Sequence, residues 1–333
     1  MATLSRNGRL LVFDCHEAWV YQLHWLRQPM DVVVGLRGRK VPGWDFAMRP
    51  EPANARIMRL DDVLAAGEVY DCIIAHNLSD LLDAKSLVGP RLLVLHETLD
   101  GLALEQSTAI TAADLRKAVA QYTALTHGHA ISVSELKARS WDLSDWVAFA
   151  CDPADYPPPS GDLAVGLRVA NQIHAKRRTL LWDFHEAVFA DIPITLVGRN
   201  NGMPGVRPAR DWEDLKDVLR RHRFYIHTAH PQLEDGYNMA MLEAMAAGLP
   251  ILGNRHPASP ITHGLNGFLS DDPAELRSFA LWLLRDRELA ARMGREARVT
   301  VAEKFSPARF MEGLRRAIAT AQQKWLARSA SVN

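Results

Sequence analysis

The residues best suited to chemistry lie in one short stretch, Glu234–Pro250, in which a polar loop leads into an apolar helix. Between Met239 and Ala247 every residue except Glu243 is apolar, so the pattern predicts a helix that is buried over most of its surface. An unpaired charge inside a protein is costly. Glu243 therefore either lines a ligand site or lies on a narrow exposed stripe of the helix.

The loop before this helix, residues 235–238, has the composition of an anion-binding site. Free backbone N–H groups at a helix N-terminus, together with the helix dipole, attract phosphate groups. A carboxylate accepts two hydroxyl hydrogen bonds at once, which suits Asp235 and Glu243 to the hydroxyls of a sugar or a ribose. A glycosidase pair is the weaker interpretation. Their separation would span roughly 12 Å in a helix, whereas paired glycosidase carboxylates lie about 5–9.5 Å apart.

Short apolar runs that alternate with helical stretches must position this loop. Continuous apolar runs are typical of strands buried on both faces of a parallel sheet, so the fold class is predicted to be α/β. The expected helices include residues 17–26, 111–125, 175–189, 212–222, 238–247 and 272–285. The expected strands are residues 9–14, 30–36, 70–76, 91–97, 129–134 and 145–150, then 163–169, 192–198, 223–228 and 249–252.

A proline-rich connector divides the chain. Asp155–Gly161 contains three consecutive prolines and then Ser-Gly, which cannot continue a helix. We therefore predict one Rossmann-like domain over residues 1–156 and a second over 162–305, with a final helix in 306–333 that packs back toward the first. Two doubly wound domains are expected to face each other. Ligands bind beyond the carboxyl ends of parallel strands, so the cleft between the domains is the expected site.

The charge balance agrees with two domains of different roles. The chain has 39 basic and 39 acidic residues; the first 160 residues hold 15 and 20 of them (net −5), which leaves 24 and 19 (net +5) for the rest. A basic half can attract an anion. A neutral total argues against a dedicated nucleic-acid binder, and no nucleic-acid surface is expected.

Several other classes are excluded by missing motifs. No phosphate-binding P-loop, dinucleotide-binding GxGxxG or GxSxG nucleophile elbow occurs, and no His-Glu pair has the second histidine of a zinc protease. Asp271-Asp272 before Pro273 is interpreted as a helix N-cap rather than a metal site. No metal ligands are expected.

The cysteines and the hydropathy indicate a reducing compartment. Cys15, Cys72 and Cys151 form no CxxC pair, and no long apolar run suggests a signal peptide or a membrane helix. We expect a cytoplasmic protein without an integral membrane segment.

The stretch around Glu243 resembles a known family. A carboxylate, seven residues and then Glu in Leu-Glu-Ala-Met-Ala-Ala-Gly is similar to the donor-site motif of retaining, nucleotide-sugar-dependent glycosyltransferases of the GT-B fold, family 4-like. Residues 263–310 are similar to the region that follows this motif in the family. The resemblance covers about residues 163–320. It is weaker in the first half, where it rests on residues 129–137 and on His96-Glu97 after a strand.

The resemblance implies roles for individual residues. Asp235 would contact the donor sugar and Glu243 the ribose hydroxyls, while His96 would face the sugar near the reacting carbon. Cations that stabilise a leaving diphosphate are expected in the second half. The remaining donor-site residues would be Arg168, Lys176, Arg199, Gly236, Tyr237, Asn238 and Met239.

Three departures from the family pattern stand out. Asp235 replaces the first Glu, and the spacing from Arg168 to Lys176 is longer than usual. The first strand is followed by Asp14-Cys-His-Glu17 instead of paired glycines, so His16 and Glu17 either change the approach to the donor or serve the acceptor. Residues 37–52, with Trp44 and Phe46, form either an aromatic acceptor loop or a long connection.

The predicted function is transfer of a sugar, with retention, from a nucleotide-diphosphate donor to an unknown acceptor. Front-face attack needs no carboxylate nucleophile, and arginine, lysine and a helix N-terminus replace a metal, so no cofactor is expected. Two alternatives remain open. One is a non-catalytic sugar-nucleotide-binding protein, and the other is a GT-B epimerase that acts on the nucleotide sugar itself.

Overall fold

The protein was analysed as a computed structural model that describes residues 8–39, 43–106 and 110–328. It folds into two compact units, one made of the residues up to Ala148 together with those from Ala308, the other of Phe149–Pro307. The division precedes the proline-rich connector, because the chain from Phe149 already bonds to the second unit. Cys151 N–H, for example, donates to the carbonyl of Phe305 at 2.9 Å.

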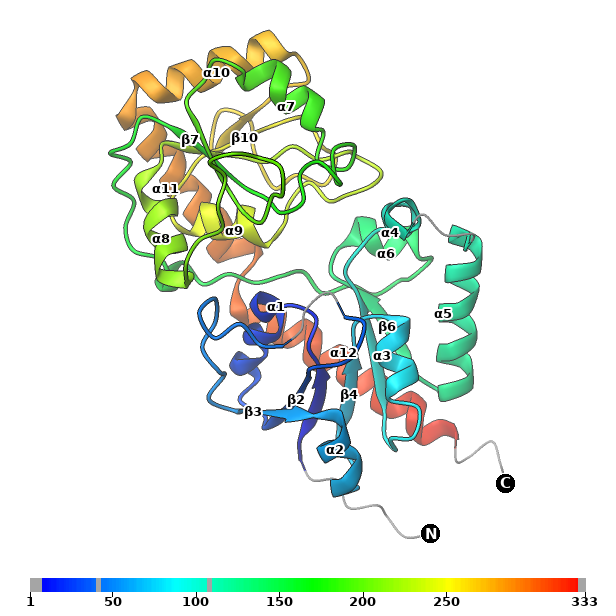
Figure 1. Ribbon diagram of the computed structural model, residues 1–333. Coiled ribbons are helices and arrows are strands. Elements are labelled where there is room, and N and C mark those ends of the chain that lie inside the picture. The colour runs from blue at the N-terminus through cyan, green and yellow to red at the C-terminus, as the bar shows by residue number, and fades with distance from the viewer. Residues whose placement is uncertain (1–7, 40–42, 107–109, 329–333) are drawn as a thin grey trace. The chain divides into compact units, whose positions relative to one another are not determined.

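The N-terminal unit is built on a six-stranded sheet whose pairs are all parallel (Figure 1). The strand order β3-β2-β1-β4-β5-β6 places the topological switch point between β1 and β4. Loops after these strands therefore gather at the carboxyl edge of the sheet. The strands are β1 (Leu10–Phe13), β2 (Met30–Val34), β3 (Ala55–Arg59), β4 (Cys72–Ala75), β5 (Arg91–Leu95) and β6 (His129–Ser132).

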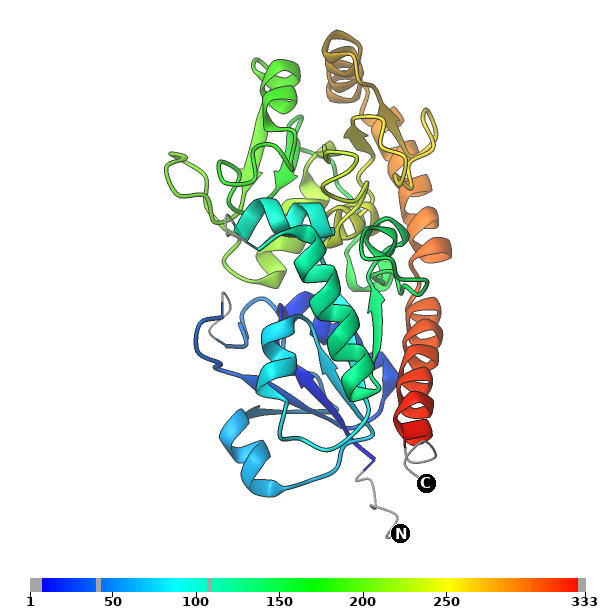
Figure 2. The ribbon, with the colours of Figure 1, turned by 90° about the vertical axis from the view of Figure 1, so that its right-hand side faces the viewer.

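Helices connect these strands, and the last helix of the chain belongs to the same unit. Figure 2 shows that helix, α12, in red at the end of the chain. Phe310 of α12 packs its ring 6.1 Å from that of Trp19, and Gln322 donates to the carbonyl of Asp71 at 3.1 Å. The helices are α1 (Glu17–Tyr21), η1 (Gln22–Leu26), α2 (Leu60–Ala66), α3 (Leu78–Asp83), α4 (Leu99–Gln106), α5 (Ala112–Thr126), α6 (Glu135–Ser140) and α12 (Pro307–Ala327).

The C-terminal unit repeats the architecture with five parallel strands in the order β11-β10-β9-β7-β8. Its switch point lies between β7 and β9. The strands are β7 (Gly166–Val169), β8 (Ile194–Val197), β9 (Phe224–Ile226), β10 (Ile251–Gly253) and β11 (Gly267–Leu269). The helices are η2 (Pro153–Asp155), α7 (Trp182–Phe189), α8 (Trp212–Arg221), α9 (Met239–Ala246), α10 (Pro273–Arg285) and α11 (Arg287–Lys304).

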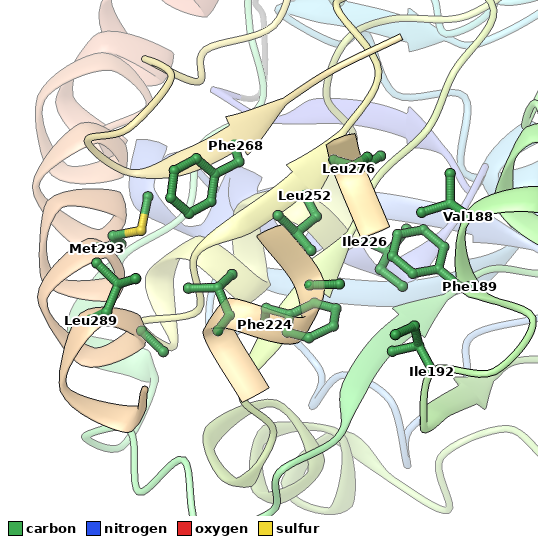
Figure 3. Packing of buried hydrophobic residues seen from close by; sticks show 13 residues of the cluster. Val188, Phe189, Ile192, Phe224, Ile226, Leu252, Phe268, Leu276, Leu289 and Met293 are labelled. Atoms are coloured by element: carbon green, nitrogen blue, oxygen red, sulfur yellow. The ribbon is translucent and has the colours of Figure 1, made fainter. Parts of the chain in front are cut away.

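One face of this second sheet is held by an apolar cluster (Figure 3). Leu276 and Leu283 lie on one face of α10 and are fully buried, and Phe224 and Leu252 meet them from the sheet. Burying each such side chain contributes about 1.5–3 kcal/mol. The cluster fixes the strands whose carboxyl ends carry the polar loops.

The predicted α/β class with two parallel sheets is confirmed, but four elements differ from the sequence prediction. Strand β11 was not predicted, and the helix expected over residues 175–189 begins only at Trp182. Residues 145–150 form no strand and contribute a single bridge between Trp146 and Ser132. Strand β3 was missed because its residues Ala55–Arg59 are largely half-exposed and lack a continuous apolar run. The N-cap prediction is confirmed at Asp272, which accepts hydrogen bonds from the first turn of α10. No helix in the part of the chain that the structure describes is long and apolar enough to cross a membrane.

Candidate functional site

Helix α9 starts at the carboxyl edge of the second sheet, where the loop from β9 enters it. Asn238 is its N-cap, and the Asn238 side-chain oxygen accepts from the Met241 N–H at 2.9 Å. Helix-favouring Met, Ala and Leu residues follow. Gly248, with a φ of 86°, turns the chain away after the helix. The helix N-terminus predicted from the sequence is therefore present in α9, and Asn238 caps it.

Asp235 is fully buried at the entrance to this helix. Its N–H donates to the Glu234 carboxylate at 2.9 Å, and its carbonyl accepts from Nε2 of His227 at 3.2 Å. Burial lowers the pKa of His227 to about 4, so its ring is neutral at pH 7. These backbone bonds fix the loop that precedes α9.

Gly236 is required by close packing. A Cβ added at Gly236 would lie 2.5 Å from the Ser259 backbone nitrogen and 2.6 Å from Nδ1 of His256. The neighbouring Tyr237 is buried, with its ring 5.0 Å from that of Phe305. The side chain of Tyr237 thus anchors the loop in the interior of the unit.

Glu243 does not lie on an exposed stripe, because only 5% of the residue is accessible. Its charge acts on Tyr225, whose pKa is raised chiefly by burial and further by Glu243. The Tyr225 hydroxyl donates to the carbonyl of Val169 at 3.2 Å, at the end of β7. Glu243 thus lies on the side of α9 that faces the switch point.

Arg168 occupies β7 at the same edge and is almost fully buried. Its guanidinium donates to the Thr228 hydroxyl at 2.8 Å and to the Leu180 carbonyl at 2.9 Å, and it lies 5.5 Å from the Trp182 ring centroid. Burial lowers its pKa to about 10, so it stays charged at neutral pH. Arg168 ties the loops after β7 and β9 together and brings a positive charge to the switch point.

A pocket of about 680 Å³ opens between the loops that follow β7 and β8. The Asn200 side chain closes its base by donating to the Ala170 carbonyl at 2.7 Å and accepting from the Ile173 N–H at 2.8 Å. Of the residues that line the pocket, only Arg199 was predicted from the sequence, although its neighbours are polar and also directly follow two predicted strands. The pocket is lined by Asn171, Gln172, Ile173, His174, Ala175, Arg199, Asn200 and Asn201.

Lys176, predicted as a donor-site residue, directly follows Ala175, which lines this pocket. The Lys176 N–H donates to the carbonyl of Gln172 at 2.9 Å, and the residue is half-buried. The structure therefore brings Arg168, Lys176, Arg199 and the loop before α9 to one edge of one unit. Their individual roles stay predictions.

The N-terminal unit gathers histidines at its own switch point. Nδ1 of His76, after β4, lies 2.9 Å from Nε2 of His96, after β5. From the loop after β1, Cys15 Sγ lies 3.9 Å from the same nitrogen, and the His16 ring is 5.5 Å from that of His96. His76 was missed, although it follows its strand just as His96 follows its own.

Burial dominates the electrostatics of this cluster. It lowers the pKa of His16 to about 4 and of His76 to about 3, and it lowers the pKa of His96 well below its ordinary value. It raises the pKa of Asp14 to about 7, with a further contribution from Glu17. The imidazoles are therefore neutral at pH 7, able both to donate and to accept.

The predicted acceptor-side residues hold a loop together. Glu17 accepts from the Asp45 N–H at 3.2 Å, and the Trp44 indole donates to the carbonyl of Arg49 at 2.8 Å. Trp44 is only 7% exposed, whereas Phe46 is 60% exposed. The exposed aromatic surface is thus Phe46, and the acceptor role of Trp44 stays a prediction.

Solved structures of other proteins share this fold. The two doubly wound units form a GT-B fold, as in Anabaena HepE (Alr3699) in complex with UDP and glucose (TM-score 0.67, 13% identity, 94% of this chain and 99% of that one). Sucrose-phosphate synthase from Thermosynechococcus elongatus is also similar (TM-score 0.62, 13% identity, 98% and 100%).

A family model matches part of the C-terminal unit. Residues 192–286 match the family described as "Glycosyl transferases group 1". The chain is 38% identical to N-acetyl-alpha-D-glucosaminyl L-malate synthase of Bacillus anthracis over 76 residues. This aligned segment makes up 22% of this chain and 20% of that protein. The match thus spans about a fifth of that relative.

Proposed function

We propose that this protein is a retaining glycosyltransferase that uses a nucleotide-diphosphate sugar. The observation that carries the proposal is the loop and helix from Asp235 to Glu243, buried and capped at a switch point within the matched segment. HepE was solved with UDP and glucose, so a uridine diphosphate sugar is the first donor to test.

In this proposal the donor diphosphate meets the N-terminus of α9, where backbone N–H groups and the helix dipole favour negative charge. The positive charges of Arg168 and Lys176 stabilise the phosphate oxygens as the glycosidic bond breaks. Asp235 and Glu243 accept hydrogen bonds from the sugar and ribose hydroxyls. No metal is needed for the leaving group, since these groups supply the charge.

Transfer then follows a front-face course. The bond between the anomeric carbon and the diphosphate oxygen breaks, and the acceptor oxygen bonds to the same face of that carbon. The leaving diphosphate oxygen takes the proton of the acceptor hydroxyl. His96 is assigned to the sugar near the reacting carbon, and the loop around Phe46 to the acceptor.

The donor assignment is tested by calorimetric titration of UDP into the Glu243→Ala variant. Loss of hydrogen bonds to a charged group contributes about 1.5–3 kcal/mol, so UDP affinity should fall roughly ten- to hundredfold. Glu213→Ala, at a side chain that is 80% exposed, is the matched control and should bind as wild type. Unchanged affinity in Glu243→Ala contradicts the ribose role.

The activity is tested by incubating the protein with a panel of nucleotide sugars and simple acceptors. Transfer or slow donor hydrolysis, with the α-configuration of an α-linked donor kept in the product, supports the proposal. Tight binding without either reaction identifies the non-catalytic alternative, and a changed sugar without any acceptor identifies an epimerase. His96→Ala should lose transfer while UDP affinity is kept.

A further inference from the structure

Three metal-binding side chains converge at the carboxyl edge of the N-terminal sheet. The sulfur of Cys15 and one ring nitrogen each of His76 and His96 all lie within 4.8 Å of one another. They follow three different strands, β1, β4 and β5, so the topology itself brings them together. We propose that Cys15, His76 and His96 bind one divalent cation of borderline softness, with Zn²⁺ as its representative.

The first argument is the crowding around one lone pair. Neutral imidazole has a single acceptor lone pair, on its unprotonated nitrogen. His76 Nδ1, at 2.9 Å, and Cys15 Sγ, at 3.9 Å, both approach Nε2 of His96. Whether it donates or accepts, that nitrogen makes one good hydrogen bond, whereas one metal ion binds all three atoms. A tetrahedral zinc centre with bonds of about 2.0–2.3 Å needs only a few tenths of an ångström more space between the nitrogens.

The second argument is the chemistry of the set. Thiolate and imidazole are ligands that zinc prefers, and three protein ligands with an open fourth position are typical of a reactive zinc site. Cys15 is a free cysteine in a half-buried position, so its thiol is not held in a disulfide. His76 is 5% exposed, which keeps that side of the site dry.

The third argument is the neighbouring carboxylate. Both oxygens of Asp14 are buried and form no hydrogen bond within the part of the chain that the structure describes. A buried carboxylate without such bonds is costly. A dication bound by one thiolate carries a net positive charge, and the adjacent Asp14 would balance it.

Binding rearranges protons in a defined way. The Cys15 thiol loses its proton to water as the sulfur–metal bond forms, and each imidazole keeps one N–H on the nitrogen that does not bind. With Nε2 of His96 on the metal, its proton is held on Nδ1, which forms no hydrogen bond to any described residue.

The first measurement is a calorimetric titration of chelator-treated, donor-free protein with Zn²⁺. The second is the absorption spectrum of the same protein loaded with Co²⁺. We expect one ion per chain and a thiolate-to-cobalt charge-transfer band. Cys15→Ser should remove the charge-transfer band. Cys15→Ser and His76→Ala should each weaken Zn²⁺ binding by more than about 100-fold, which is more than the loss of a residue that only supports a ligand usually causes. Cys72→Ala, at a buried thiol on β4 outside the cluster, should bind as wild type.

Two results would overturn the proposal. One is a wild-type protein that takes up no stoichiometric Zn²⁺, and the other is a Co²⁺ complex without the thiolate band. Both measurements use the wild-type chain, so they decide the question even if a variant fails to fold. Because no donor is present, a failure of glycosyl transfer leaves the metal result unaffected.

Discussion

Single residues decide whether the loop before α9 can exist in this form. Gly236 lies where the loop at His256–Ser259 leaves no room for a side chain, and Asp235 is buried beside it. Glu243 is the one charge on a buried helix, placed against Tyr225. The structural role of each of these residues can be tested by measuring stability, without any assay of a reaction.

Gly236→Ala should destabilise the protein by about 1–3 kcal/mol, because its Cβ would lie 2.5 Å from a backbone nitrogen. The measurement is chemical unfolding of the full chain. Gly43→Ala is the control, since no atom of the described residues lies within 4 Å of a Cβ added there. Equal stability of the two variants would show that the 256–259 loop moves aside easily.

At the scale of elements, the carboxyl ends of the strands carry the candidate sites in both units. In the second unit the cap of α9 combines two tasks, since Asn238 satisfies a backbone N–H and stands at the proposed diphosphate position. Stability and ligand binding can be separated there by changing only the charge of the cap.

Asn238→Asp should keep the stability of the helix, because aspartate caps as well as asparagine. UDP binding should nevertheless weaken, since a negative charge would face the diphosphate. Asn238→Ala is the comparison and should lose about 1 kcal/mol of stability. The measurements are thermal unfolding and UDP titration; an Asp variant that binds UDP as wild type would move the diphosphate away from this helix end.

At the scale of the whole molecule, buried neutral histidines couple stability to pH. In the C-terminal unit burial lowers the pKa of His185 to about 2 and of His227 to about 4, and it also lowers the pKa values of His222 and His256. Their unfolded forms take up a proton near pH 6.5, while the folded forms do not. The stabilisation is therefore complete above pH 6.5 and is lost as the pH falls toward the folded pKa.

The free energy of unfolding should thus decrease between pH 7.5 and pH 5, by about 2 kcal/mol for each fully buried histidine. Urea unfolding at both pH values measures this, with the two units followed as separate transitions. His185→Leu should reduce the slope, because it removes one group that must stay neutral. A stability that is independent of pH over this range would contradict the neutral state of these rings.

The sequence by itself determined the α/β class, most of the strands and the loop before α9. Continuous apolar runs such as Leu10–Phe13 and the capped, nearly uncharged helix at Met239 are local patterns that one stretch of chain carries alone. β3 escaped because its half-exposed residues gave no such pattern.

Only the tertiary structure decided which residues meet. His76 joins Cys15 and His96 because β4 lies beside β1 and β5 in the sheet, an order that no local pattern encodes. The burial of Trp44, the exposure of Phe46 and the contacts of Arg168 are likewise set by neighbours distant in the sequence. A sequence pattern reports the environment that a segment requires, whereas packing selects its partners.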